Sequence, residues 1–212
     1  TAPSSWIDRE GREHRIEALA VESSKFERWA LEDALTGLAN LRRFEQCLDE
    51  WSAVAADKGQ PLCVAIIDAD SFRHINNTFG HPIGDKVLRG IAAEMKTQVR
   101  ETDLPARLGG DEFAILFRDT EEQVAEQVAR RLEQAVREHD WTGLSQSLRV
   151  SISIGVVEAQ PGEAKKELVK RSDAVMYARK QERHLAEVAS TVPRAVVQRV
   201  TGWLRRAQRV VL

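Results

Sequence analysis

The chain has few cysteines, no long apolar run and no excess of positive charge, and each absence excludes a class of protein. Two cysteines among 212 residues are too few for a disulfide framework. No stretch approaches the roughly 18 to 20 apolar residues that a membrane-spanning helix needs. A formal net charge of −2 argues against binding to nucleic acid polymers, which depends on a basic excess. Any recognition of phosphate must therefore be local.

The cysteines and the first residues of the chain indicate its surroundings. Cys47 falls in a helical pattern and Cys63 in an apolar strand pattern, so both are expected to be core residues in a reducing compartment. The segment 1–5 lacks the character of a signal peptide and does not begin with methionine. We expect a cytoplasmic chain that is a piece of a larger protein, with a sensory domain upstream.

The length allows one sizeable core with helical extensions. Residues 1–33 are charged, with sparse apolar residues at heptad-like steps, and are interpreted as a helical stalk or linker. This stalk is either a short parallel coiled coil or a helix that packs on the domain. At the other end, residues 189–212 form a basic amphipathic helical pattern. That helix could contact an anionic membrane, a partner protein or its own domain.

Between these extensions the pattern alternates between strands and helices. After a helix that runs to Lys58, we expect a strand over 62–67, a helix over 83–99, a hairpin around Gly109 and Gly110, a second helix and a strand over 148–156. A capping box of Thr120 and Gln123 is expected to open the second helix. The last strand alternates strictly, so one buried face is expected. This order predicts an α+β fold, an antiparallel-type sheet with helices on one face.

Two acidic sites stand out in this pattern. Gly109 and Gly110 allow a tight turn that presents Asp111 and Glu112, and the apolar run 62–67 ends at Asp68. Taken singly, these are an ordinary hairpin with solvated acids and a strand that stops at polar residues. Taken together, Asp68 and Asp111 are hard oxygen ligands from separate elements, which suits Mg²⁺ held partly by substrate phosphates.

These residues carry a family resemblance that covers about residues 33–180. The segment 109–113 spells Gly-Gly-Asp-Glu-Phe, and the chain resembles the GGDEF domain of diguanylate cyclases. The segments 33–40 and 68–85 resemble the opening motif and the nucleotide-binding stretch of that family. The resemblance implies a palm-like, ferredoxin-like nucleotidyl cyclase architecture with the catalytic domain over 34–188. It also implies condensation of two GTP molecules into cyclic di-GMP with release of two pyrophosphates, in a homodimer with one GTP per half-site.

The resemblance assigns roles to individual residues. It implies Mg²⁺ or Mn²⁺ ligation by Asp68, Asp111 and the Ala69 carbonyl, and catalytic roles for Asp111, Glu112 and Arg73. The ligand role of Asp111 is the firmer one, because a metal disfavours protonation of its carboxylate. The substrate contacts that it implies are Phe72, Asn76, His81, Asp85 and Lys180, with backbone amides near Ser71 on the phosphates. A carboxylate at Asp85 can accept hydrogen bonds from guanine donors that adenine lacks, which disfavours an adenylyl-type cyclase.

Two further motifs bear on regulation and on activity. Arg100 and Asp103 precede Gly109 at the spacing of the family's RxxD site, which implies product binding and feedback inhibition; a local Arg–Asp ion pair is the alternative. The family's Gly-Arg-Asn is replaced by segment 183–185, which places His184 at the arginine position. This replacement leaves a second function open, a catalytically weak module that binds GTP or cyclic di-GMP as a signal. Arg179 or Arg183 could offset the lost charge.

Overall fold

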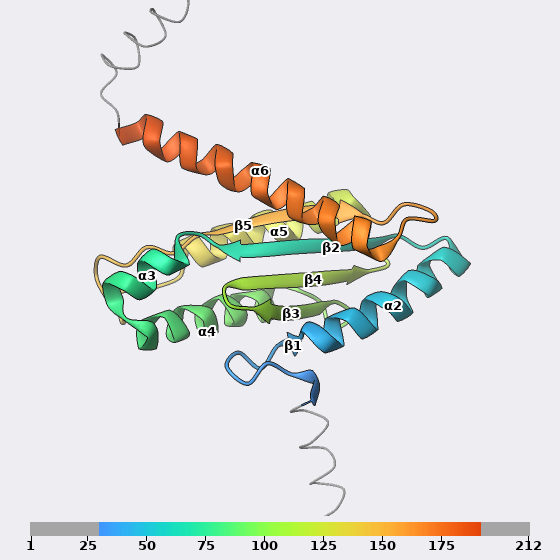
Figure 1. Cartoon of the computed structure of the whole chain (residues 1–212), viewed down its shortest axis with the longest axis horizontal. Helices are drawn as coiled ribbons and strands as arrows, with labels where there is room; N and C mark the ends of the chain where they lie inside the picture. The colour runs from blue at the N-terminus through green and yellow to red at the C-terminus, as the bar shows by residue number, and fades with distance from the viewer. Residues whose placement is uncertain (1–29, 192–212) are drawn as a thin grey trace, which may run out of the picture.

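The computed structural model describes residues 30–191, so most of the expected stalk (1–33) and of the C-terminal basic helix (189–212) lies outside the described residues. Figure 1 shows a central sheet flanked by helices. The elements are β1 (Ala39–Asn40), α2 (Leu41–Lys58), β2 (Leu62–Ala69), α3 (Phe72–Phe79), α4 (His81–Gln98), β3 (Leu104–Gly109), β4 (Glu112–Arg118), α5 (Glu122–Glu138), β5 (Ile152–Glu158) and α6 (Lys165–Thr191).

The sheet has five strands in the order β1-β3-β4-β2-β5. The pairs β3–β4, β4–β2 and β2–β5 are antiparallel, as expected, whereas the two-residue β1 pairs parallel to β3. The sheet is therefore mixed, and the α+β class is confirmed. Within residues 30–191, none of the helices is both long enough and apolar enough to cross a membrane.

Helices cover both faces of the sheet, so the expectation of helices on one face is wrong (Figure 1). Alternate residues of β2 point into two separate cores: Cys63, Ala65 and Ile67 pack with α4 and α5, and Val64 and Ile66 pack with α2 and α6. The expectation of one buried face for the last strand is wrong for the same reason, because all of 152–157 in β5 is buried. Ser153 and Gly155 are small, so this face of β5 is covered by the fold, with α6 packed directly on Gly155, and does not face water.

The expected capping box at Thr120 is wrong, whereas the expected burial of both cysteines is confirmed. Thr120 does not cap α5: Glu121 is the N-cap, and the Thr120 hydroxyl instead donates to the Arg118 carbonyl at 2.8 Å. The strand before α5 ends so close to it that the hydroxyl is used in the connecting turn. Cys47 and Cys63 are free and buried, as expected. Burial raises the pKa of the Cys63 thiol to about 12, which leaves it unreactive.

Helix α6 lies directly on the sheet because two small residues permit it. The Ser172 hydroxyl accepts a hydrogen bond from the Ile66 amide at 3.0 Å and donates to the Gly155 carbonyl at 2.8 Å. A Cβ atom at Gly155 would lie 2.2 Å from both the Met176 nitrogen and the Ser172 carbonyl oxygen. The backbone of α6 therefore occupies the space that a side chain at position 155 of β5 would need.

We expect Gly155→Ala to lower the free energy of unfolding by about 3 kcal/mol, because backbone atoms of α6 leave no space for a methyl group. Urea denaturation followed by circular dichroism measures this change. Gly143→Ala is the matched control, since no atom lies within 4 Å of its Cβ position. Equal stability of the two variants would contradict this account of α6.

Candidate active site

The pairing of β2 with β4 brings the acidic residues together. Asp68 lies directly opposite Glu112 in the antiparallel register. One residue further, the Ala69 amide donates to the Asp111 carbonyl at 3.1 Å. Asp68 and the glycine turn therefore meet on adjacent strands, as the sequence predicts.

The carboxylates at this end of the sheet repel one another. Burial, together with nearby Asp111 and Asp70, raises the pKa of Asp68 although Lys180 lies beside it. Burial, Asp68 and Asp111 likewise raise the pKa of Glu112. Lys180 forms an ion pair with Asp68 from α6, so the expected substrate-binding lysine is the local counter-charge for the acidic group.

Asp70 is near this cluster, but its carboxylate is already occupied. It accepts hydrogen bonds from the hydroxyls of Ser151 and Ser153, both at 2.6 Å, and forms an ion pair with Arg183 at 2.8 Å. This side chain anchors α6 and β5 to the end of β2. The two carboxylates therefore differ: Asp68 pairs with Lys180 next to the acidic cluster, whereas both oxygens of Asp70 hold elements of the fold together.

The donor set suits a hard divalent cation that is held partly by substrate. Asp68, Asp111 and the Ala69 carbonyl supply oxygen donors, and the nearby carboxylates of Asp111 and Asp70 add negative charge beside Asp68. In the described part of the chain, no group of three or more His, Cys, Asp or Glu side chains is arranged to hold an ion. Oxygens from elsewhere, such as phosphates, would have to complete the coordination.

The glycine turn is stabilised by hydrogen bonds from Arg107, a residue that the sequence pattern did not indicate. Gly110 adopts a φ of 53°, which a glycine accepts readily. Arg107 donates to the Gly110 carbonyl through Nη2 at 2.7 Å and through Nε at 3.1 Å. The same guanidinium forms an ion pair with Asp33 at 3.0 Å, so one side chain links the opening motif to the turn.

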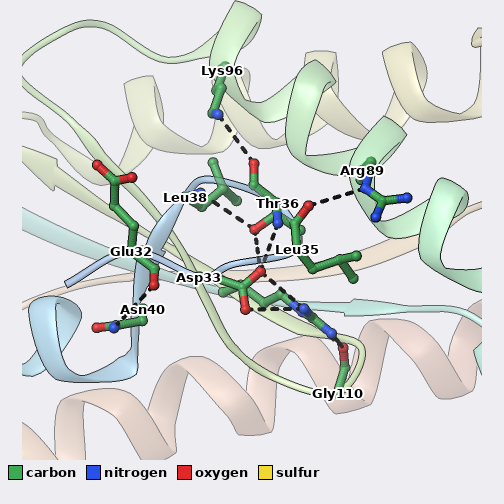
Figure 2. Close-up of polar contacts among 10 residues, drawn as sticks. Glu32, Asp33, Leu35, Thr36, Leu38, Asn40, Arg89, Lys96 and Gly110 are labelled. Atoms are coloured by element: carbon green, nitrogen blue, oxygen red, sulfur yellow. Dashed lines mark hydrogen bonds and ion pairs between the residues drawn. The ribbon is translucent and has the colours of Figure 1, made fainter. Parts of the chain in front are cut away.

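The opening motif is itself a compact hydrogen-bonded loop. Asp33 accepts from the Thr36 hydroxyl at 2.7 Å and from its amide at 2.9 Å. Lys96 and Arg89 of α4 donate to the carbonyls of Thr36 and Leu35, both at 3.3 Å (Figure 2). This loop, which lies just before β1, is therefore connected both to helix α4 and to the glycine turn. The spacing of residues in the sequence gave no signal for the pair of Arg107 with Asp33, because the two residues are 74 positions apart.

The beginning of α3 offers backbone donors next to Asp68. Ser71 has a φ of 54°, and no side chain caps the helix that starts at Phe72. The first amides of a helix have no partner within it, so they are available to an anion. Arg73 is exposed on the first turn of α3, and Phe72 is partly buried against the core.

Helices α3 and α4 bring the expected nucleobase residues together. Asn76 of α3 lies against the first turns of α4, next to the position of Asp85. Asp85 and His81 are both exposed, whereas Asn76 Oδ1 is buried and has no hydrogen-bond partner. A buried polar atom without a partner is uncommon and calls for an explanation.

Arg100 and Asp103 lie at the other end of α4, which at 18 residues is roughly 27 Å long. Asp103 is 8% exposed and accepts from the Arg100 amide at 3.0 Å, while its second oxygen is buried without a partner. Burial raises the pKa of Asp103. The Arg100 side chain is exposed. The pair is therefore separate from the acidic cluster, and β3 runs from it to the glycine turn.

The two arginines near the altered segment of α6 are already engaged. Arg179 forms an ion pair with Glu126 at 2.6 Å, and Arg183 forms one with Glu133 at 3.1 Å. Both carboxylates belong to α5, so these pairs tie α6 to α5 across β5. Neither arginine is placed as a free replacement for the one that His184 displaces.

Comparison with known proteins agrees with this geometry. The family model described as "Diguanylate cyclase, GGDEF domain" matches residues 30–185. The response regulator PleD of Caulobacter vibrioides is 40% identical over 154 residues, which are 71% of this chain and 34% of PleD. The diguanylate cyclase DgcP of Pseudomonas aeruginosa is 35% identical over 76% of this chain and 24% of DgcP. The chain thus spans about a third or less of these relatives.

Solved structures show the same fold. The coiled coil and GGDEF domain of DgcB from Caulobacter crescentus, solved in complex with cyclic di-GMP, superposes with a TM-score of 0.75 at 29% identity, over 81% of this chain and 91% of that one. The diguanylate cyclase SiaD of Pseudomonas aeruginosa, solved with its activator SiaC, gives a TM-score of 0.69 at 33% identity, over 82% and 71%.

The ion pair of Arg107 with Asp33 predicts a pH-dependent stability. Burial alone would raise the pKa of Asp33, but hydrogen bonds from Thr36 and Arg107 outweigh this effect and hold the pKa below its ordinary value. The ionised carboxylate thus stabilises the fold above pH 4 or so, and this contribution is lost as the pH falls through the lowered pKa. We expect Asp33→Asn to cost about 1–2 kcal/mol at pH 7 and progressively less towards pH 3.

Urea denaturation of both proteins at several pH values measures this difference. Asp57→Asn, at an exposed position of α2, is the control for the loss of one charge. A cost of Asp33→Asn that stays constant between pH 7 and pH 3 would show that the ion pair is not its source.

Proposed function

The chain belongs to the GGDEF domain family of diguanylate cyclases, and on this basis we propose that it condenses two GTP molecules into cyclic di-GMP and two pyrophosphates. The observation that carries the proposal is the cluster of Asp68, Asp111 and Glu112 beside Lys180, at the beginning of an uncapped helix. Opposite charges lie side by side there, as a complex of metal and triphosphate requires.

The chemistry is an in-line displacement. The 3′-oxygen of one GTP forms a bond to the α-phosphorus of the other, and the bond from that phosphorus to pyrophosphate breaks. Bound Mg²⁺ or Mn²⁺, held by Asp68, Asp111 and the Ala69 carbonyl, would supply positive charge to the phosphates. Lys180, Arg73 and the first amides of α3 would orient the triphosphate.

The proton of the attacking hydroxyl needs an acceptor. Glu112 is suited to this role, because burial and its acidic neighbours raise its pKa and so increase its affinity for a proton. Asp111 is better suited to metal ligation than to proton transfer. Asp85 and Asn76 would bind guanine, and His81 would lie at the same end of α4.

Both reacting nucleotides must meet, so we propose that two copies of the chain face one another with one GTP each. Residues 34–188 would form the catalytic unit, residues 1–33 a stalk that aligns the two copies in response to an upstream domain, and residues 189–212 a separate basic segment. Helix α6 continues to Thr191 in the structure, so the last boundary lies within a helix.

We further propose that Arg100 and Asp103 bind the product and inhibit turnover. The exposed arginine three residues before Asp103 suits a guanine edge and a phosphate. The site lies roughly one length of α4 from the residues proposed to bind the nucleobase, so the product would act at a distance. Strand β3 provides the connection to Arg107 and the glycine turn.

The ion pairs of Arg179 and Arg183 favour a second candidate function, a weak cyclase or a signal-binding module. Both are held in ion pairs with α5, so they do not replace the arginine that the family has at the position of His184. Loss of one charge-assisted hydrogen bond to the triphosphate would cost roughly 1.5–3 kcal/mol. The chain would then be a weak cyclase, or a module that binds GTP or cyclic di-GMP as a signal.

Turnover of GTP with Mg²⁺, followed by separation of the nucleotides, tests the proposed activity. We expect cyclic di-GMP from the chain and none from Asp111→Asn. Without metal, the variant is expected to be as stable as the parent or up to about 1 kcal/mol more stable, because a source of repulsion on Asp68 and Glu112 is gone. Asp57→Asn is the control. A dimer that binds GTP but makes no product would favour the signal-binding module, with His184→Arg as the variant that restores turnover.

Arg100→Ala is expected to abolish inhibition by cyclic di-GMP while the initial rate stays within about twofold of the parent, because the residue lies at the far end of α4 from the reacting groups. Initial rates over a range of added product measure the effect. Arg130→Ala removes an exposed arginine of α5 and serves as the control. If Arg100→Ala remained as sensitive to product as the parent, feedback through this pair would be refuted.

A further inference from the structure

Gly84 occupies the place where α4 contacts α3 most closely. A Cβ atom at this glycine would lie 1.9 Å from Asn76 Oδ1 and 3.2 Å from Phe72 Cζ. Separations under 3.0 Å are essentially never found around real Cβ atoms, so no other residue fits here without movement. Glycine in a helix costs about 1 kcal/mol relative to alanine, which makes its presence in the first turns of α4 a constraint of packing.

The contact determines how the Asn76 amide is oriented. Its Oδ1 atom is directed at the hydrogen-only face of Gly84, where it is buried and has no hydrogen-bond partner. The amide nitrogen is not among the buried atoms without a partner. Because the oxygen and nitrogen of a side-chain amide diverge from their shared carbon, the –NH₂ group is directed away from Gly84 as a donor.

Asp85, the next residue of α4, supplies the complementary group. Its carboxylate is exposed and accepts hydrogen bonds only. A donor on Asn76 and an acceptor on Asp85 together complement a purine edge that carries both an acceptor and N–H donors. Guanine presents such an edge, with N1–H and the exocyclic amine next to ring or carbonyl acceptors.

We propose that Gly84 is a positioning residue for the nucleobase: its missing side chain lets Asn76 turn its carbonyl oxygen inward and present its –NH₂ group to guanine. The proposal rests on the proposed binding of GTP. It extends the nucleobase site from the residues that touch the base to the glycine that orients one of them.

The test compares Gly84→Ala, Asn76→Ala and the double variant, with Gly143→Ala as a control glycine that has no atom within 4 Å of its Cβ position. Calorimetry in the presence of Ca²⁺ measures GTP affinity, and steady-state kinetics separates KM from kcat. We expect Gly84→Ala and Asn76→Ala each to weaken GTP binding and raise KM by about 10-fold or more, with kcat within about twofold.

The double variant gives the decisive result. Removal of the amide makes space for the new methyl group, so the double variant should bind GTP within about twofold of Asn76→Ala. Losses that multiply would show that Gly84 acts on the fold rather than through Asn76, and would overturn the proposal. This comparison also decides the matter if Gly84→Ala alone does not fold.

A second probe separates the base from the phosphates. Inorganic tripolyphosphate with Ca²⁺ engages only the phosphate end, so Gly84→Ala should bind it as the parent does. Equal weakening towards tripolyphosphate and GTP would overturn the proposal. Failure of the parent chain itself to bind GTP would refute the proposed function, whereas normal GTP binding by Gly84→Ala would refute the role of Gly84 alone.

Discussion

The site depends on the pairing of β2 with β4, which holds Asp68 opposite Glu112 and the Ala69 amide against the Asp111 carbonyl. This pairing concentrates negative charge at one end of the sheet, where burial and the repulsion between neighbouring carboxylates raise the pKa values of Asp68 and Glu112. Two hydrophobic cores fix the register, because a slip of one residue would exchange every side chain between them. Burial of apolar surface thus maintains an arrangement that the charges alone would disperse.

Around this pairing, small residues and ion pairs place the other parts of the site. Gly155 and Ser172 seat α6 on the sheet, which brings Lys180 to Asp68 two turns later. Arg107 holds the glycine turn and connects it to Asp33 at the beginning of the domain. A movement of the segment before β1 would reach the glycine turn through this guanidinium. The structure therefore offers a physical route from that segment to the proposed chemistry.

The sequence was informative where a residue acts through local pattern, and it was silent where contacts are distant. The apolar run before Asp68 and the glycine pair before Asp111 predicted that the two acids meet, because antiparallel pairing follows from the order of strands. The strict alternation in 148–156 was misleading: serine and glycine at alternate positions indicated a solvated face, whereas in β5 Ser153 and Gly155 are covered by the fold. Neither the link of Arg107 to Asp33 nor the clearance at Gly84 follows from spacing, since both depend on how elements pack.

The central claim is that the protein supplies only part of a metal site and that nucleotide phosphates complete it. Electron paramagnetic resonance of Mn²⁺, titrated with and without a GTP analogue that cannot release pyrophosphate, tests this claim most directly. The account predicts tight Mn²⁺ binding only when the nucleotide is present, and its loss in Asp68→Asn. Equally tight binding without nucleotide, or none with it, would contradict the account.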